Sequence, residues 1–355
     1  MQGELCLALD TIQDARYATG EDLLVARWTV TQHKDKAAAT VPQQETPTYL
    51  WHAGKLVEWE KATTHITNIA WPSISMVFEG IRGYWSPRRQ EVYLFHLEAH
   101  LKRLWQSMTL MRMTSSYSKE ELARAIVEVV EANGYKDDVY ISPFAYFREG
   151  VPGYVGVKDM PSEVLITARP SPSNLGTDLV AHCCISSWTR IADNVMPPRA
   201  KAIANYQNSR LVSTEATLNG YDFGIILNSQ GRVSEAAYAC IFIVRDGVAI
   251  TPPHSAGILE SITRATIIEL LKDMGVAVEE RDVDRTELYI ADEAFLCGTS
   301  VEIRPVPSVD RYVLGDGAIG PVTRQLMELF HQAVRGEDPR YARWLTPVYE
   351  RARVR

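Results

Sequence analysis

The chain has 355 residues, of which 46% are hydrophobic and 23% are charged, and its formal net charge is −7. This length predicts about two domains, and the acidic balance argues against nucleic acid or an anionic membrane as a partner. Five cysteines without a CxxC pair argue against a disulfide framework or a zinc site, which indicates reduced thiols, no metal and a cytoplasmic protein.

The first 47 residues are predicted to be an N-terminal extension and linker. Residues 31–47 are rich in Lys, Gln, Thr and Ala and have little apolar periodicity, as is typical of a loop. Residues 1–10 carry acids and lack the basic segment of a signal peptide. No apolar run in the chain approaches the ~18 residues that a membrane span needs.

Two helices are expected in the segment that follows. The first carries apolar residues at helical spacing, namely Leu97, Leu101, Leu104, Trp105 and Met108. The second begins at a capping box formed by Ser118 and Glu121 and is predicted to stop at Gly134. Strand-like runs follow at residues 139–147 and 163–168.

A connector is predicted at residues 169–176, because its two prolines and two serines suit an extended segment between domains. The predicted organisation is a small α/β domain at 48–169, a linker at 170–178, a large domain at 179–340 and a C-terminal tail at 341–355.

Beyond the connector, strands and helices mix. Strands are expected at 179–187, 223–227, 240–244, 248–251 and 293–297, and helices at 208–219, 262–274 and 321–335. Asp246 and Gly247 predict a two-residue hairpin turn between two of these strands. Because the order lacks regular βαβ alternation, the predicted fold class is α+β and not a doubly wound sheet.

One lysine and its surroundings are the most informative feature of the chain. Lys201 and Tyr206 lie in the run R-A-K-A-I-A-N-Y, between a strand-like and a helix-like segment. Downstream come V-S-E, ending at Glu235, then I-T-R at 262–264 and G-T-S at 298–300. An amine, a phenol, a carboxylate and two small-hydroxyl turns are the groups needed to hold pyridoxal phosphate (PLP). A lone lysine would be a surface charge, so the inference rests on the whole set.

The chain resembles the fold-type IV aminotransferases, and within them most closely the branched-chain amino acid aminotransferases. The matching motifs are V-F-E-G-I-R at 77–82, E-A-H-L-K-R-L at 98–104, S-S-W at 186–188, A-K-A at 200–202, N-Y at 205–206, T-P-P at 251–253, I-T-R at 262–264 and G-T at 298–299. The resemblance covers about residues 49–335. It implies a two-domain fold of the D-amino acid aminotransferase type, with PLP in the large domain.

The resemblance also implies a homodimer or a higher even oligomer, in which a loop near residues 151–157 covers the cofactor of the neighbouring subunit.

Roles at the cofactor follow from the same resemblance. Lys201 would be the Schiff-base lysine and the proton shuttle, Tyr206 would bond the ring oxygen, and Glu235 would face the pyridine nitrogen. The residues that would bind the phosphate are Arg103, Ile262, Thr263 and Thr299, the second and third through N–H groups at a helix start. A buried amine beside a cation also leads us to expect a depressed pKa for Lys201.

On the substrate side the resemblance implies contacts from Phe78 and from backbone groups of Ser300 and Val301. Here the chain also departs from its relatives, which usually carry a Tyr-Gly pair at Ser73 and its neighbour, often an arginine at Ser142, and often an aromatic residue at Asn174. A one-residue misalignment in these loops is the competing explanation. Otherwise the cofactor contacts are kept while the substrate contacts are rewritten.

The predicted function is a PLP-dependent aminotransferase for an amino acid and a 2-oxo acid, with a specialised biosynthetic substrate and an atypical donor pocket. Two alternatives stay open: a PLP-dependent lyase, cyclase or decarboxylase on the same scaffold, and a non-catalytic PLP-binding relative. The intact set of Lys201, Tyr206, Glu235 and Thr263 argues against the last. A half-reaction that leaves pyridoxamine phosphate would separate the transaminase from the lyase.

Overall fold

The computed structural model describes residues 46–147 and 160–350. The chain forms two compact units, residues 1–43 and residues 44–355, and every element named here belongs to the second. The predicted extension lies outside the described residues up to residue 45, as does the whole loop at 151–157. The domain boundaries proposed from the sequence remain a prediction.

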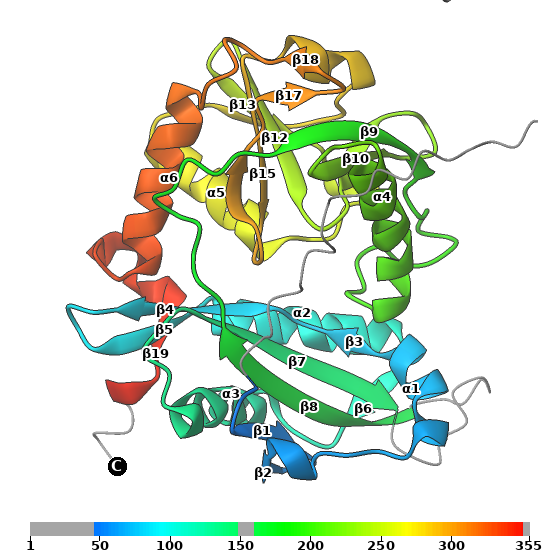
Figure 1. Ribbon diagram of the computed structural model, residues 1–355, viewed down its shortest axis with the longest axis vertical. Coiled ribbons are helices and arrows are strands. Elements are labelled where there is room, and N and C mark those ends of the chain that lie inside the picture. Colours follow the sequence, from blue (N-terminus) through cyan, green and yellow to red (C-terminus); the bar gives the residue numbers. More distant parts are fainter. Residues whose placement is uncertain (1–45, 148–159, 351–355) are drawn as a thin grey trace, which may run out of the picture. The chain divides into compact units, whose positions relative to one another are not determined.

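A nine-stranded sheet forms the first part of the described chain (Figure 1). Its main path runs β19-β5-β4-β7-β8-β1-β2, while β3 pairs with β7 and β6 with β8. The strands are β1 (Tyr49–His52), β2 (Lys55–Glu58), β3 (Val77–Phe78), β4 (Ile81–Ser86), β5 (Glu91–Phe95), β6 (Met113–Ser115), β7 (Val139–Phe147), β8 (Met160–Pro170) and β19 (Leu345–Pro347). The longest ladder is antiparallel, from Val139 opposite Pro170 to Phe147 opposite Ser162.

Strand β7 has two distinct faces, because successive side chains in a strand point to opposite sides. Val139 and Ile141 belong to the core that also contains the apolar stripes of α2 (Leu97–Leu110) and α3 (Lys119–Asn133). Tyr140 and Ser142 therefore lie on the other face, together with the less buried residues of the strand. This second face is the one that reaches the cavity described below.

Both helices predicted in this part are confirmed. In α3, Ser118 accepts a hydrogen bond from the N–H of Glu121, and the Glu121 carboxylate accepts one from the N–H of Ser118, so the capping box is complete. Gly134 ends the helix at φ 65°, in the left-handed region that glycine adopts without strain.

Two five-stranded sheets form the rest of the fold, with orders β11-β10-β9-β17-β18 and β14-β13-β12-β15-β16. The strands are β9 (His182–Thr189), β10 (Phe223–Leu227), β11 (Val233–Ala236), β12 (Cys240–Arg245), β13 (Val248–Thr251), β14 (Val278–Glu280), β15 (Glu293–Gly298), β16 (Glu302–Pro305), β17 (Ser308–Val309) and β18 (Tyr312–Val313). Asp246 and Gly247 both have positive φ between paired Arg245 and Val248, which confirms the predicted hairpin turn.

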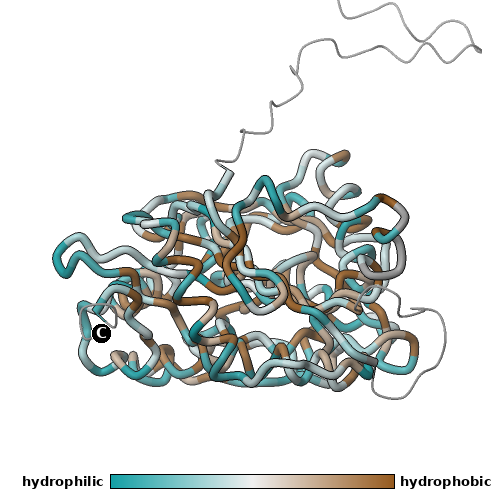
Figure 2. The backbone as a smooth tube through the Cα atoms, turned by 90° about the horizontal axis from the view of Figure 1, so that it is seen from below, coloured by the Kyte–Doolittle hydropathy of each residue, from teal (hydrophilic) through white to brown (hydrophobic). Residues whose placement is uncertain are grey.

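Strand β12 shows how the core of this part is divided. Cys240 and Phe242 pack with helices α5 (Ile262–Asp273) and α6 (Pro321–Val334), which lie beside the strands in Figure 1. Ile241 and Ile243 point the other way and pack against residues of the sheet that contains β10. Hydrophobic stretches accordingly run through the middle of the tube in Figure 2, and hydrophilic stretches follow outer turns.

The mixture of sheets and helices confirms the α+β fold class. Helix α4 (Tyr206–Leu218) lies within two residues of its predicted start. Strand β9 begins at His182 and not at residue 179, because the N–H of Ala181 bonds the carbonyl of Pro305 outside the ladder. Among the described residues, none of the helices combines the length and apolar character that crossing a membrane requires.

Candidate active site

A cavity of about 230 Å³ collects side chains from the nine-stranded sheet and from the elements that follow it. The predicted site residues that line it are Phe78, Arg103, Lys201, Tyr206, Glu235, Thr299 and Ser300. Residues far apart in the chain, from β3 to the end of β15, therefore meet at one place.

Lys201 is held from both sides of its backbone. Its N–H donates to Ser107 Oγ at 3.0 Å and its carbonyl accepts the N–H of Phe78 at 2.9 Å. The side-chain amide of Asn205 donates to the carbonyls of Pro197 and Ala200, which fixes the turn that leads into the lysine. The amine is thus presented by rigid neighbours.

The amine of Lys201 meets an aromatic and phenolic environment. Its Nζ donates to Tyr206 Oη at 2.5 Å and lies 4.6 Å from the centre of the Phe78 ring. Burial, the largest single effect, lowers the pKa of Lys201, but Tyr206, Glu79 and other groups outweigh burial and Arg103, and the pKa is raised. The depressed pKa expected from the sequence is therefore wrong for this arrangement, because that expectation left out the phenol and the carboxylate.

Glu235 lies near the end of β11 and is 6% exposed. Its Oε1 is 2.8 Å from Arg190 Nη2, and its Oε2 accepts the N–H of Leu259 at 3.0 Å. Arg190 also donates to the carbonyl of Gly257 at 3.0 Å, so its position does not depend on the glutamate alone. A carboxylate paired in this way stays ionised, as a partner for a protonated ring nitrogen must be. Sequence reasoning missed Arg190, although it follows the S-S-W motif by two residues.

Arg103 on α2 is oriented by a buried glutamate. Its Nε and Nη2 donate to the two oxygens of Glu79 at 2.6 and 2.8 Å, and its Nη1 donates to the carbonyl of Glu260 at 2.9 Å. A guanidinium has five N–H groups, so two remain for a bound anion. Ser261 Oγ caps the start of α5 by accepting the N–H of Arg264, and the first N–H groups of a helix lack partners within it.

A phosphate fits this corner, because Arg103 supplies charge and the N–H groups of Ile262 and Thr263 open α5 next to the cavity wall at Ser261. An aldehyde also finds the amine of Lys201 here, and a ring finds Tyr206 and Glu235. The residues present therefore fit PLP.

Glu79 is the second residue that sequence reasoning missed, although it lies in the V-F-E-G-I-R motif. It is fully buried, and His100 Nδ1 lies 2.7 Å from its Oε2. Burial alone would raise the pKa of Glu79, but Arg103 and His100 more than offset it and hold the pKa well below its ordinary value. Gly80 follows because a Cβ there would lie 1.8 Å from Tyr140 Oη, on the cavity wall.

The predicted substrate residues are placed less uniformly. Ser142 shares its strand face with the cavity residue Tyr140. Ser73 lies on the short helix α1 (Ala70–Ser75), and Asn174 lies on the connector between β8 and β9. Neither of these, nor Val301, belongs to the cavity wall itself.

Comparisons with known proteins agree with this geometry. The model of the family described as amino-transferase class IV matches residues 76–309. A probable branched-chain-amino-acid aminotransferase of Aquifex aeolicus (strain VF5) is 40% identical over 306 residues, which are 85% of this chain and 97% of the relative. The branched-chain-amino-acid aminotransferase of Escherichia coli (strain K12) is 38% identical over 303 residues, with 84% and 97% covered.

Solved structures show the same similarity. The branched-chain amino acid aminotransferase of Thermobaculum terrenum in its PLP form is 50% identical, with a TM-score of 0.83 and coverage of 86% of this chain and 99% of that one. A further branched-chain amino acid aminotransferase, from T.th., has been solved in complex with 4-methylvaleric acid. It is 37% identical, with a TM-score of 0.80 and coverage of 85% and 99%.

Replacement of the lysine is the first prediction. Of the described residues that line the cavity, Lys201 alone carries an amine, so Lys201→Ala is expected to abolish turnover. The variant should still retain PLP through the phosphate corner, which dialysis followed by cofactor quantification would show. Turnover close to that of the wild type would disprove the role of Lys201.

Replacement of the glutamate is the second prediction. Glu235→Gln should slow the proton-transfer steps by about a hundredfold or more, a few kcal/mol, while cofactor affinity changes less. The measurement is the single-turnover rate. Because Glu235→Gln also leaves Arg190 without its carboxylate, the double variant with Arg190→Gln serves as the stability control. An unchanged single-turnover rate would show that Glu235 is structural.

Proposed function

Since the chain belongs to the amino-transferase class IV family and is a PLP-dependent transaminase similar to branched-chain aminotransferases, we propose that its amino acid substrate carries a larger or more polar uncharged side chain than the usual donors. The observation that carries the transaminase assignment to particular residues is the Lys201–Tyr206 contact of 2.5 Å beside Glu235 and Arg103.

PLP supplies an aldehyde that condenses with amines and a ring that draws electrons from the substrate Cα. In the proposed division of labour, Lys201 bonds the cofactor and then moves the proton of the substrate Cα. Tyr206 donates to the ring oxygen, and Glu235, held by Arg190, keeps the ring nitrogen protonated. Arg103, Thr299 and the start of α5 hold the phosphate.

The proposed substrate preference rests on three uncharged side chains. Ser142 lies on the cavity face of β7, while Ser73 and Asn174 belong to α1 and to the connector. None of them can form a bidentate ion pair with a side-chain carboxylate. Leaving such a carboxylate desolvated and unpaired costs several kcal/mol.

Two arginines could in principle replace the missing charge. Arg82 is 3% exposed, and its guanidinium already donates to three backbone carbonyls. Arg304 is outside the residues that line the cavity. The described residues thus support a site that disfavours glutamate.

The substrate prediction follows directly. Glutamate should be a poor donor, with a half-reaction rate at least about tenfold below the best uncharged amino acid, since an unpaired carboxylate is costly. The test mixes the PLP form with glutamate, leucine and a panel of polar amino acids and follows conversion of PLP to pyridoxamine phosphate. If glutamate proves the fastest donor, the proposed pocket residues are wrong. Ser142→Arg should raise the glutamate rate and leave the leucine rate less affected.

A non-reacting carboxylic acid helps to separate binding from chemistry. One of the solved relatives holds 4-methylvaleric acid. We propose that this acid also binds the cavity of the present chain, since it has the carboxylate and an apolar side chain but no amine. Its dissociation constant then reports on the substrate site without turnover.

We also propose that the active protein is a homodimer or a higher even oligomer, since two-fold dimers are the commonest assemblies. Exposed apolar side chains near α1 support this, with Ile66 77% and Ile74 53% exposed. Sedimentation equilibrium is expected to give at least twice the chain mass of 39.9 kDa. A fully active monomer at assay concentration would disprove it, and Ile66→Glu should weaken the association.

A further inference from the structure

The turn between β15 and β16 has an unusual closing residue. Gly298 and Glu302 are register partners, so residues 299–301 form a three-residue hairpin loop. Glu302 closes it at φ 57°, in the left-handed region where such hairpins favour glycine. Thr299 and Ser300 of the same loop line the cavity. The backbone of this turn is therefore held in a strained form at the site itself.

The side chain of Glu302 turns inward and is fully buried. Its Oε1 accepts the hydroxyl of Ser173 and its Oε2 accepts the N–H of Asn174, both at 2.7 Å. Its Oε1 also lies 3.8 Å from Arg82 Nε. The residue that closes the turn thus fixes the connector that carries Asn174.

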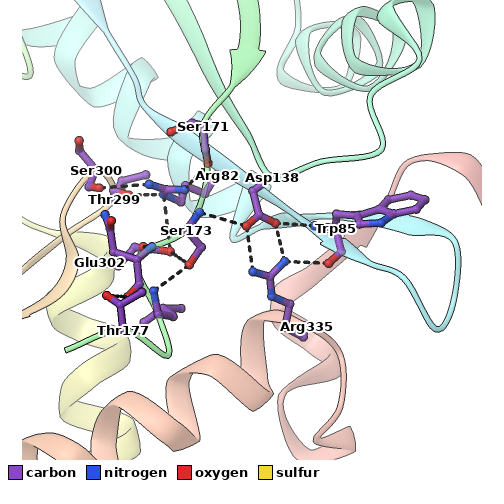
Figure 3. A network of polar contacts seen from close by, with 12 residues as sticks. Arg82, Trp85, Asp138, Ser171, Ser173, Thr177, Thr299, Ser300, Glu302 and Arg335 are labelled. Atoms are coloured by element: carbon purple, nitrogen blue, oxygen red, sulfur yellow. Dashed lines mark hydrogen bonds and ion pairs between the residues drawn. The ribbon is translucent and has the colours of Figure 1, made fainter. Parts of the chain in front are cut away.

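Arg82 holds the same two segments from the nine-stranded sheet (Figure 3). Its Nε donates to the carbonyl of Thr299 at 3.0 Å and its Nη2 to the carbonyl of Ser300 at 3.2 Å. Its Nη1 donates to the carbonyl of Ser171 on the connector at 2.8 Å. One planar guanidinium therefore fixes two successive peptide planes of the turn.

The direction of these carbonyls decides the direction of two N–H groups. In a trans peptide the C=O and the following N–H point to opposite sides of the chain. With the carbonyls of Thr299 and Ser300 turned to Arg82, the N–H groups of Ser300 and Val301 point away from it. Adjacent N–H groups that point the same way form a site for a carboxylate.

We propose that the buried Arg82–Glu302 pair is a positioning device that aims these two N–H groups at the substrate carboxylate and, through Ser173 and Asn174, keeps the connector in step with the turn. The proposal rests on the proposed function, because it assigns the carboxylate end of the same substrate site. Neither residue touches the substrate, and both act through the backbone that they hold.

A neighbouring ion pair provides a matched control. Arg335 pairs with Asp138 and donates to the carbonyl of Trp85, while Asp138 Oδ2 accepts the N–H of Ser173. This pair is partly buried and belongs to the same network in Figure 3, but within the described part of the chain the hydrogen bonds of Arg335 go to Trp85 and Asp138 and not to residues 299–302. Loss of its geometry should affect stability without affecting the turn.

The experiment compares Arg82→Lys, Glu302→Gln and the control Arg335→Lys as PLP-loaded full-length proteins. Each is measured for the dissociation constant of 4-methylvalerate, for kcat and KM with leucine, and for PLP affinity. Arg82→Lys and Glu302→Gln are expected to weaken 4-methylvalerate and raise KM by about tenfold, with kcat within about threefold and PLP affinity within about twofold. Arg335→Lys should keep all four values within about twofold.

The proposal is overturned if both test variants bind 4-methylvalerate as the wild type does, or if they lose PLP affinity in proportion. Should Glu302→Gln fail to fold, Ser173→Ala removes one of its hydrogen bonds more gently and should weaken 4-methylvalerate about threefold, and an unchanged value overturns the proposal. A wild type that transaminates no amino acid would refute the proposed function instead, while the binding comparison would still test the role of Arg82 and Glu302.

Discussion

The buried ion pair between Glu79 and Arg103 is the contact on which the cavity depends. It joins the end of β3 to α2 in the nine-stranded part, and the third donor of Arg103 reaches the carbonyl of Glu260 just before α5. Removing one partner of such a pair leaves an uncompensated charge and costs ~3–5 kcal/mol. Arg82 repeats the arrangement at another wall of the cavity, with backbone carbonyls of residues 299 and 300 as acceptors and Glu302 as the nearby carboxylate. Two arginines from one part thus position backbone groups of the other.

The elements that could be predicted from the sequence are those specified by neighbouring residues. Helix α3 is delimited by a capping box and by Gly134, and the β12–β13 hairpin is determined by Asp246 and Gly247, so local patterns predict both within a residue or so. The same holds for the order of Lys201, Tyr206 and Glu235, whose spacing along the chain is enough to suggest one cofactor. The structure brings these three to a single cavity, and their roles remain proposals.

What could not be predicted depends on contacts between distant segments. Strand β19 exists because residues 345–347 pair with β5, whose residues come far earlier in the chain, and nothing in a three-residue run indicates this. Arg190 and Glu79 look like ordinary charged residues until the fold places them against Glu235 and Arg103. The error over the pKa of Lys201 has the same origin, because the opposing effect of Tyr206 depends on a side-chain approach of 2.5 Å.

Departures from local backbone preference point to the same conclusion. Several described non-glycine residues with positive φ, such as Ala53 and Gln90, lie in exposed turns where strain is easily accommodated. His96 and Glu302 do not. His96, at φ 52°, precedes α2, and its ring contacts Thr266 on α5 at 3.0 Å while burial lowers its pKa to about 3. A left-handed residue that is not glycine costs ~1–2 kcal/mol, and a glycine would avoid that cost but could make neither side-chain contact. Both strained residues therefore occur where a side chain from one part must reach the other, as expected of positions selected for geometry at the cavity rather than for local stability.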